Sequence, residues 1–253
     1  MRVGFIADVH DDVVRLREAF DLLERRGCDE VACLGDMVGY CTPFYGFLRS
    51  RNGHEVVSLI KEKCSKAVVG SHDLYAVRRV PKHKAGFDYP KNWYKLDYWR
   101  RNELAGGKVY LYEGNELSPL LTREDEEYIK GLPEYLVASF GAVKALLSHW
   151  IYPDFSGSMT SNPEKLGDYA EHLRFMERHN CILSIQGHDH ERVLSFSPEE
   201  VRELPLGSTV ELASEPQGFI CPCVANGTFP NGVMVLDTDR MELARAALSL
   251  KWF

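Results

Sequence analysis

Two histidines separated by one residue offer the first candidate for chemistry in this sequence. The segment Gly187-His188-Asp189-His190 follows an apolar run, residues 181–186, that has the composition of a buried strand leading into a turn. Imidazoles at positions i and i+2 of such an exit can face one cavity, where neutral ring nitrogens bind zinc, manganese, iron or nickel. A single His-x-His pair is more often an ordinary polar loop, so the metal interpretation depends on the rest of the chain.

Further polar groups follow short apolar runs, each at the point where a predicted strand ends. They are Asp8 and His10 after residues 2–7, Asp36 after residues 30–34, Ser71, His72 and Asp73 after residues 66–69, and His149 after residues 143–147. In open α/β sheets, chemistry collects at the carboxyl ends of the strands. We therefore expect these side chains to meet the two histidines of the Gly187 turn at one edge of the fold.

The elements that must position these groups alternate between strand and helix in the first part of the chain. Residues 2–7 have the nearly continuous apolar character of a buried parallel strand. Asp11 or Asp12 can cap a following helix, whose apolar side chains share one face and which Gly27 ends. Strands are predicted next over residues 30–34 and 66–69. This alternation is typical of an α/β fold.

The later part of the chain is predicted to be mostly strand. A Thr-x-x-Asp capping box indicates a helix from Thr122 to Lys130, and Asn162-Pro163 is a typical helix start. A hairpin is expected over residues 136–147. The strands expected after His190 are residues 193–196, 209–212, 233–236 and 243–248. A turn-rich loop is expected over residues 224–230.

Residues 80–117 differ in composition from the rest of the chain. Aromatic side chains alternate with lysines and arginines there, and residues 91–104 are compatible with a helix. One interpretation is a cap near the site that offers aromatic surfaces to a ring and cations to phosphate. The other is a packed excursion with solvated lysines and arginines, and the sequence favours neither. Since no linker or repeat is visible, residues 1–253 are predicted to form a single domain.

Composition and charge restrict the function classes. The chain has 253 residues, enough for a sizeable core, and a net charge of −7 without a basic run, which does not favour a nucleic-acid binder. The apolar run at the amino terminus is too short for a signal peptide and is soon followed by polar residues, and no apolar run has membrane-spanning length. We therefore expect a cytoplasmic protein without a membrane partner. The seven cysteines form no CxxC pair, so disulfides and structural zinc are not expected. The histidines outside the motifs, His54, His83, His172 and His179, are expected at the surface.

The order of the polar groups resembles the pattern of a known family. In sequence the groups are Asp8-x-His10, Gly35-Asp36, Gly70-Ser71-His72-Asp73, His149 and Gly187-His188-x-His190. They are similar to the motifs D-x-H, G-D, G-N-H-D/E, H and G-H-x-H of the calcineurin-like metallophosphoesterases. The resemblance covers residues 3 to about 237. It implies an α/β (α+β) fold, the four-layer α-β-β-α sandwich, with two metal ions at the strand ends.

The resemblance also implies a role for each group. One metal ion would be held by Asp8, His10 and His190, the other by His149 and His188, with Asp36 bridging both and Ser71 at the position of a further ligand. His72 would lie beside the leaving group as a general acid, with a pKa lowered by the metals unless a carboxylate offsets them. Asp73, in the same motif, is a second catalytic candidate, with a helix cap as the alternative.

Two divalent ions would give an acidic protein the positive charge that attracts phosphate. A hydroxide held between them could attack phosphorus in line with the leaving oxygen. Mixed carboxylate and imidazole ligands favour manganese, with iron, nickel, zinc or magnesium as alternatives, over calcium.

Several positions depart from the family pattern. Ser71 stands where the family has an asparagine whose amide oxygen binds the second metal. A serine hydroxyl is shorter and a poorer donor, so the second ion would be weaker or a water would fill the gap. Trp150 and Cys41 replace glycines that are usual in the family, and the loop Ala225-Asn226-Gly227-Thr228 resembles its Asn-Pro-Gly-Ser only loosely. These changes affect the substrate more than the chemistry.

The expected function is hydrolysis of a small phosphoester, a phosphodiester or phosphomonoester that includes nucleotide-like compounds. Phosphodiesters are slightly favoured because a second ion and an acid suit an alkoxide leaving group. The main alternative keeps the fold with weakened catalysis as a ligand-binding or scaffold module, as in the phosphoesterase-like subunit of the retromer coat. A third possibility is a nuclease, which would need a long basic groove, and the overall acidity of the chain does not favour it. The sequence is also compatible with a homo-oligomer.

Overall fold

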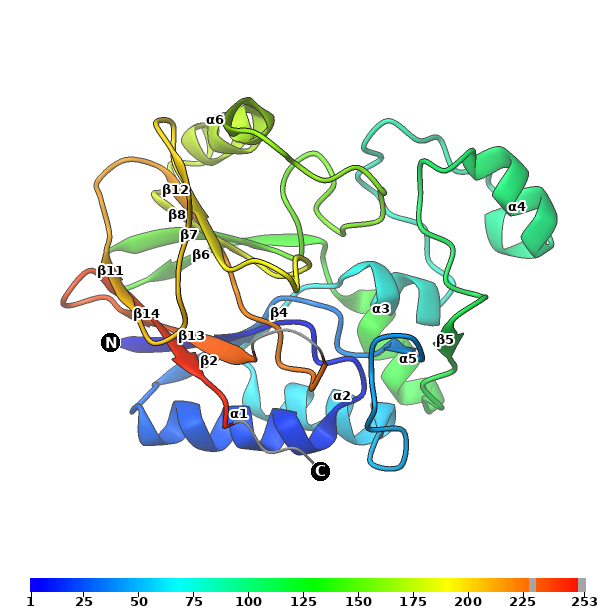
Figure 1. Ribbon diagram of the computed structural model, residues 1–253, viewed down its shortest axis with the longest axis horizontal. Helices are drawn as coiled ribbons and strands as arrows, with labels where there is room; N and C mark the ends of the chain where they lie inside the picture. Colours follow the sequence, from blue (N-terminus) through cyan, green and yellow to red (C-terminus); the bar gives the residue numbers. More distant parts are fainter. Residues whose placement is uncertain (228–230, 250–253) are drawn as a thin grey trace.

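Two six-stranded sheets lie face to face in the computed structural model, which describes residues 1–227 and 231–249 (Figure 1). The first sheet contains, in spatial order, β11 (Thr209–Glu211), β14 (Glu242–Ala247), β13 (Gly232–Asp237), β1 (Arg2–Ile6), β2 (Glu30–Cys33) and β4 (Lys66–Ala67). The second contains β10 (Val201–Glu203), β9 (Leu194–Phe196), β12 (Gln217–Ile220), β8 (Leu183–Gln186), β7 (Val143–Ser148) and β6 (Tyr135–Phe140). A separate two-stranded sheet pairs β3 (Tyr40–Cys41) with β5 (Glu116–Leu117).

Helices cover the outer faces of both large sheets. The outer face of the first sheet packs against α1 (Val13–Arg25), α2 (Gly53–Lys63) and α5 (Arg123–Gly131), and that of the second against α6 (Ala170–Arg178), which follows the short 3₁₀ helix η2 (Leu166–Tyr169). The two remaining α-helices are α3 (Ser71–Ala76) and α4 (Tyr98–Ala105). The predicted α/β (α+β) fold is therefore confirmed, and these layers are consistent with a four-layer α-β-β-α sandwich. Among the described residues, no helix has the length and apolar character needed to cross a membrane.

Strand β1 shows how alternation builds the two cores. Val3 and Phe5 point between the sheets, where Phe5 meets Phe140 edge-on at a ring-centroid distance of 5.9 Å. Ile6 points to the other face and packs against α1 and α2. Because both faces of the strand are covered, its sequence is apolar at nearly every position, as in buried parallel sheets.

Parallel pairing brings the predicted groups to one edge of the sandwich. Strands β1, β2 and β4 run parallel in the first sheet, and β7 and β8 run parallel in the second. Parallel strands end at the same edge of a sheet, so the residues that follow these five strands are neighbours. The backbone joins them further, since Asp8 N donates to Gly35 O at 3.1 Å and Gly187 N to His149 O at 2.9 Å.

Two predicted helix boundaries are wrong. Over residues 91–104 the chain forms only the short 3₁₀ helix η1 (Trp93–Lys95) before α4, because the Asp97 carboxylate accepts from Arg100 N and starts the helix there. The helix expected from Asn162 begins only at Leu166, since the Asp168 carboxylate accepts from Glu164 N and Lys165 N. Both boundaries are set by an aspartate acceptor that the apolar periodicity does not show.

Several elements were not predicted at all. They are α2, α3, β3, β5, β10 and β12. Part of the predicted loop over residues 224–230, including Thr228, lies outside the described residues. All seven cysteines are free thiols.

His172 is buried, so its predicted surface position is wrong. Its Nδ1 accepts from Tyr152 N at 2.8 Å, and its Nε2 lies 2.9 Å from Ser184 Oγ. An accepting Nδ1 carries no proton, so the ring is neutral, and burial lowers its pKa to about 3. Of the other three histidines, His54 is exposed while His83 and His179 are half-buried.

We expect His172→Gln to make folding less sensitive to acid. Between pH 6.5 and about 3, His172 binds a proton in the unfolded chain but not in the folded protein. The free energy of unfolding therefore decreases as the pH is lowered through this range. The contribution is about 1.4 kcal/mol per pH unit. Urea unfolding of both proteins from pH 7.5 to 4.5 should give the shallower pH dependence for the variant, even if the variant is less stable at pH 7.5. Equal slopes would contradict a neutral buried His172.

Candidate metal centre

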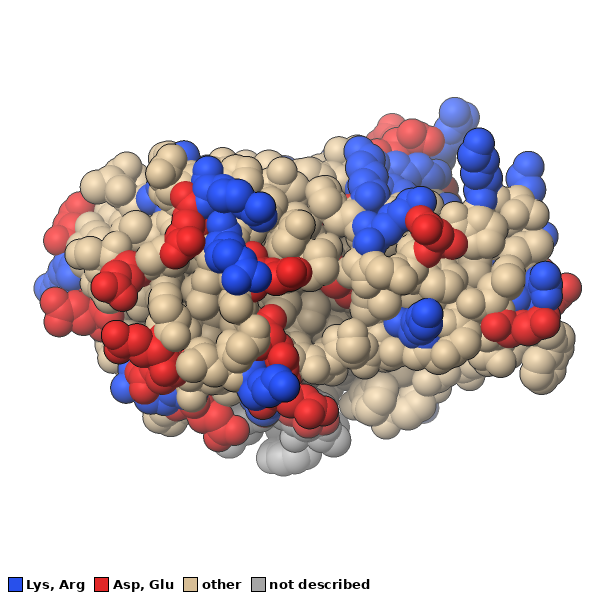
Figure 2. Space-filling view, turned by 90° about the horizontal axis from the view of Figure 1, so that it is seen from above, with Lys and Arg blue, Asp and Glu red and all other residues tan. Residues whose placement is uncertain are grey.

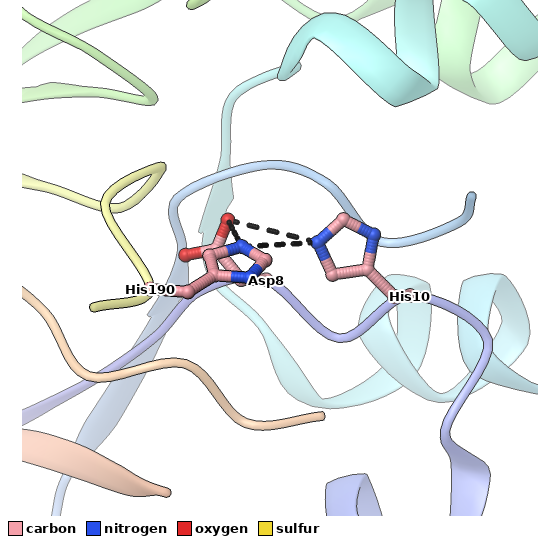
Figure 3. A group of neighbouring side chains, drawn as sticks. All are labelled: Asp8, His10 and His190. Atoms are coloured by element: carbon pink, nitrogen blue, oxygen red, sulfur yellow. Dashed lines mark hydrogen bonds and ion pairs between the residues drawn. The ribbon is translucent and has the colours of Figure 1, made fainter. Parts of the chain in front are cut away.

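Asp8, His10 and His190 form the first group of side chains that could hold a cation (Figure 3). Asp8 and His10 follow β1, and His190 lies in the loop after β8. Asp8 Oδ1 lies 3.1 Å from His190 Nε2 and 3.9 Å from His10 Nε2, and the two Nε2 atoms are 3.2 Å apart. The three ligand atoms therefore converge on one point, as the resemblance implied.

The backbone fixes the tautomer of His10. Its Nδ1 lies 2.9 Å from Gly39 O, and since a carbonyl only accepts, Nδ1 carries the proton and Nε2 carries a lone pair. That lone pair faces the second imidazole nitrogen and the Asp8 carboxylate, an arrangement that needs a positive charge among them. Burial, with the neighbouring His72 and His190, lowers the pKa of His10 to about 3. Burial disfavours charge on His190, but Cys223 and Asp8 outweigh it and raise the pKa of that ring.

Asp36, His149 and His188 form the second group. His149 Nδ1 lies 2.9 Å from Leu34 O, so its Nε2 is again the ligand atom, 3.0 Å from Asp36 Oδ2. This buried Nε2 has no hydrogen bond of good geometry among the described residues. Burial disfavours charge on His149, but Asp36 and Asp8 outweigh it and raise the pKa to about 9. Such an unpartnered buried nitrogen beside a carboxylate fits a cation ligand.

Trp150 and Gly157 hold the His188 ring in place. The Trp150 ring is buried and lies 4.7 Å from the His188 ring, and a side chain at Gly157 would come within 2.5 Å of His188 Nδ1. Trp150 is not among the residues that line the pocket. Trp150, which stands where the family has a glycine, therefore supports the candidate ligand His188 and does not narrow the pocket.

Four of the predicted ligands have a left-handed backbone conformation. The φ angles are 57° for Asp8, 47° for His10, 49° for Asp36 and 72° for His188. Non-glycine residues seldom adopt such angles, and they cluster at functional sites where the surrounding structure enforces them. Of the nine described non-glycine residues with a positive φ, four are thus predicted ligands.

The motif glycines allow the backbone to approach the carboxylates. A Cβ at Gly70 would lie 2.1 Å from Asp36 Oδ1, and one at Gly187 would lie 2.6 Å from Asp8 Oδ2. The adjacent amides use this closeness, since His72 N donates to Asp36 Oδ1 at 2.9 Å and His188 N to Asp8 Oδ2 at 3.1 Å. These bonds orient the two carboxylates toward the imidazoles.

His72 is supported by a carboxylate that the sequence motifs do not contain. Its Nδ1 lies 2.5 Å from Glu116 Oε2, at the start of β5. Burial disfavours the charged ring, but Glu116 and Asp36 outweigh it, so its pKa is raised rather than lowered. Glu116 is thus the offsetting carboxylate that the sequence left open. It lies 44 residues from His72 in no motif, so no sequence signal identified it.

Ser71 and Asp73 occupy different places around this centre. Ser71 is buried at the start of α3, and its Oγ accepts from the Tyr112 hydroxyl at 2.7 Å. Asp73 is fully buried and accepts from Gly70 N at 3.1 Å and Val38 N at 3.2 Å. Each of its two carboxylate oxygens accepts from a backbone amide, and one of these bonds belongs to the capping box of α3, so the structure favours the cap alternative over a catalytic Asp73.

Asp11 and Asp12 differ in a similar way. Asp12 caps α1 by accepting from Arg15 N at 3.0 Å, as predicted. Asp11 is not a helix cap, because its carboxylate faces Arg51 at 3.2 Å. Burial, only partly offset by Arg51, raises the pKa of Asp11 to about 7.

A pocket of about 450 Å³ opens over both groups. Phe44 and Tyr45 line it near the first group, and Tyr110 and Tyr112 line it near the second. Among the described residues that line it, Arg192 is the one lysine or arginine, and it is paired with Asp189 at 2.8 Å.

The excursion of residues 80–117 thus contributes aromatic and amide side chains to the pocket, but not the predicted cations for phosphate. Its core is a cluster around Trp93, Ala105 and Val109. Many lysines and arginines gather at the right-hand end of the face in Figure 2, where Figure 1 places α4, and the surface is hollowed between that end and the left-hand part.

Comparisons with known proteins agree with this geometry. An uncharacterised protein of Methanocaldococcus jannaschii is 32% identical over 193 residues, which are 72% of this chain and 67% of that protein. A crystal structure of a metallophosphoesterase from Sphaerobacter thermophilus matches with a TM-score of 0.69 at 18% identity, over 99% of this chain and 89% of that one. A hypothetical protein from Pyrococcus horikoshii matches with a TM-score of 0.58 at 12% identity, over 99% and 88%.

The two structural matches show the shared fold, and the sequence itself shows the family. The sequence model of the calcineurin-like phosphoesterases matches residues 1–192, which include every predicted ligand. The ligand groups at the strand ends, the fold and this match agree, and the chain belongs to the calcineurin-like phosphoesterase family.

Proposed function

We propose that this protein is a metal-dependent phosphodiesterase acting on small substrates. The observation that carries the proposal is the pair of ligand groups, in which His10 and His149 commit Nδ1 to backbone carbonyls and aim Nε2 at the Asp8 and Asp36 carboxylates. Asp8, His10 and His190 would hold one divalent cation, and His149 and His188 a second, with Asp36 between them. Manganese suits these ligands, and iron, nickel, zinc and magnesium are the alternatives.

When bound, the two cations would supply Lewis acidity that activates water and neutralises charge on the phosphoryl oxygens. His72 would supply the proton for the leaving oxygen. Because the Glu116 carboxylate can only accept, Nδ1 of His72 donates to it, and Nε2 is the nitrogen that donates to a substrate. Burial of both partners keeps this pair in a fixed orientation.

The pocket favours a phosphodiester with a single phosphate whose two substituents are uncharged and contain rings. Aromatic walls flank both ligand groups, so each of the two substituents of a phosphodiester has a surface to pack against. The ring centroids of His72 and Tyr112 lie 4.1 Å apart. The leaving group would therefore occupy the side of the pocket that Tyr110 and Tyr112 line. With Arg192 paired to Asp189 and Glu191 close by, the lining does not suit a polyphosphate.

Manganese-dependent hydrolysis of bis-p-nitrophenyl phosphate tests the proposal. Protein stripped of metal should be inactive and should regain activity on addition of Mn²⁺. His10→Asn should reduce kcat by about a hundredfold or more. Removing a residue that only orients a metal ligand already costs up to about a hundredfold, and His10 is a predicted ligand itself.

His54→Asn is the matched control, because His54 is exposed, belongs to neither ligand group and contacts Asp125 in α5. It should retain wild-type activity. A wild-type protein that binds Mn²⁺ without turning over this diester or a range of phosphomonoesters would favour the ligand-binding or scaffold alternative.

Glu116→Gln should move the alkaline limit of activity to lower pH. Glu116 raises the pKa of His72, and the protonated ring is the active form, so activity is present below this pKa and lost above it. Without the carboxylate the pKa falls, and kcat at pH 8.5 should drop by about tenfold or more while kcat at pH 6 changes less.

Glu113→Gln is the control for this variant. Glu113 lies on the same excursion but pairs with Arg78 and Arg101 instead of His72. Its pH profile should match that of the wild type. A Glu116→Gln profile scaled down equally at every pH would show that Glu116 does not act through the proton on His72.

A further inference from the structure

Two hydroxyl groups meet beside the second ligand group. The Tyr112 hydroxyl donates to Ser71 Oγ at 2.7 Å, and Ser71 is only 2% exposed. Tyr112 comes from the excursion of residues 80–117, and Ser71 is the first residue of α3. A segment remote in sequence therefore reaches the turn that carries the predicted ligands.

The backbone around Ser71 is tied directly to Asp36. Gly70 approaches the Asp36 carboxylate so closely that a Cβ would overlap Oδ1, and the amide of His72 donates to the same oxygen at 2.9 Å. Ser71 lies between these two residues. The hydroxyl pair therefore lies next to the backbone that holds Asp36, the carboxylate of the second group.

The Tyr112 ring is held by its neighbours. Its centroid lies 4.1 Å from that of His72, 5.3 Å from that of Tyr75 and 6.0 Å from that of Tyr110. Burial, together with Asp36, raises the pKa of Tyr112 well above 10, so the phenol stays neutral and keeps its proton. A ring fixed in this way holds its hydroxyl at one position.

The charged and imidazole members of the second group leave room for a neutral oxygen beside them. The group contains one carboxylate and two imidazoles, whereas a serine Oγ is too close to its own backbone to reach far into a site. A hydroxyl that receives a hydrogen bond still has a lone pair, and the phenol that donates it keeps two. A pair of hydroxyls therefore offers oxygen lone pairs at a place where serine alone offers a short and mobile group.

We propose that the Tyr112–Ser71 hydroxyl pair supplies the neutral oxygen of the second cation group, with Tyr112 as the positioning residue that makes Ser71 effective. This inference rests on the proposed function, because it takes the two ligand groups to be cation sites. Occupancy of the second site then depends on the excursion, and the affinity of the first site does not.

Tyr112→Phe tests the inference, because it removes one hydroxyl and keeps the ring. Mn²⁺ binding to stripped protein, measured by equilibrium dialysis, should show two ions per chain in the wild type. The variant should bind the first ion with unchanged affinity, and its affinity for the second ion should fall by about tenfold or more. A loss of this size is typical when a residue that orients a metal ligand is removed. Electron paramagnetic resonance should change from the signal of coupled Mn²⁺ pairs to that of isolated Mn²⁺.

Three further variants make the test specific. Tyr75→Phe is the matched control, since its ring packs against Tyr112 without bonding Ser71, and it should bind both ions as the wild type does. Ser71→Ala should weaken the second ion as Tyr112→Phe does, with no further loss in the double variant. Ser71→Asn placed in Tyr112→Phe should restore the second ion, because an amide oxygen reaches further than a hydroxyl.

The outcomes separate this inference from the proposed function. A wild type that binds fewer than two Mn²⁺ at millimolar concentrations would overturn the dinuclear centre itself. Two ions in the wild type and unchanged second-ion affinity in Tyr112→Phe would overturn the role of Tyr112 alone. If that variant fails to fold, unchanged binding by Ser71→Ala would do the same.

Discussion

The structure depends on how the backbone fixes two imidazole rings. His10 and His149 each donate from Nδ1 to a carbonyl, that of Gly39 and that of Leu34, at 2.9 Å. Both bonds leave Nε2 as the nitrogen that faces a buried carboxylate and would bind a cation. Because the carbonyls belong to the segment that follows β2, the loop at this one strand end sets the ligand chemistry of both groups. A shift of that loop would disturb both groups together.

The two sheets make this arrangement possible. Each sheet alone supplies part of a site: the first carries Asp8, His10 and Asp36, and the second carries His149 and His188. The core between the sheets, with Phe5 against Phe140, fixes their separation, so the apolar packing determines whether the ligand atoms converge. The strained φ angles at four ligands are held by the same packing.

Sequence reasoning identified the residues whose type and place are both set by a strand end. Asp8, His10, Asp36, His149, His188 and His190 all follow short apolar strands, and parallel pairing brings them together. Glu116 and Tyr112 could not be found in this way, because they lie in no motif and their contacts with His72 and Ser71 cross 44 and 41 residues of chain. His172 was misjudged because its partners, Tyr152 N and Ser184 Oγ, are unrelated to any periodic pattern. Local pattern thus predicts the ligands but not the residues that orient them.

The outer support of the centre is divided between two parts of the chain. Adjacent residues of α3, Ser71 and His72, are each bonded by the excursion, through Tyr112 and Glu116. These two are joined in one turn, since Glu116 N donates to Tyr112 O at 3.0 Å. The first ligand group instead has its contacts with Gly39 and Tyr45, outside residues 80–117. The position of one short turn therefore sets the surroundings of Ser71 and His72 together, whereas the first ligand group is built by the sandwich and the loop after β2.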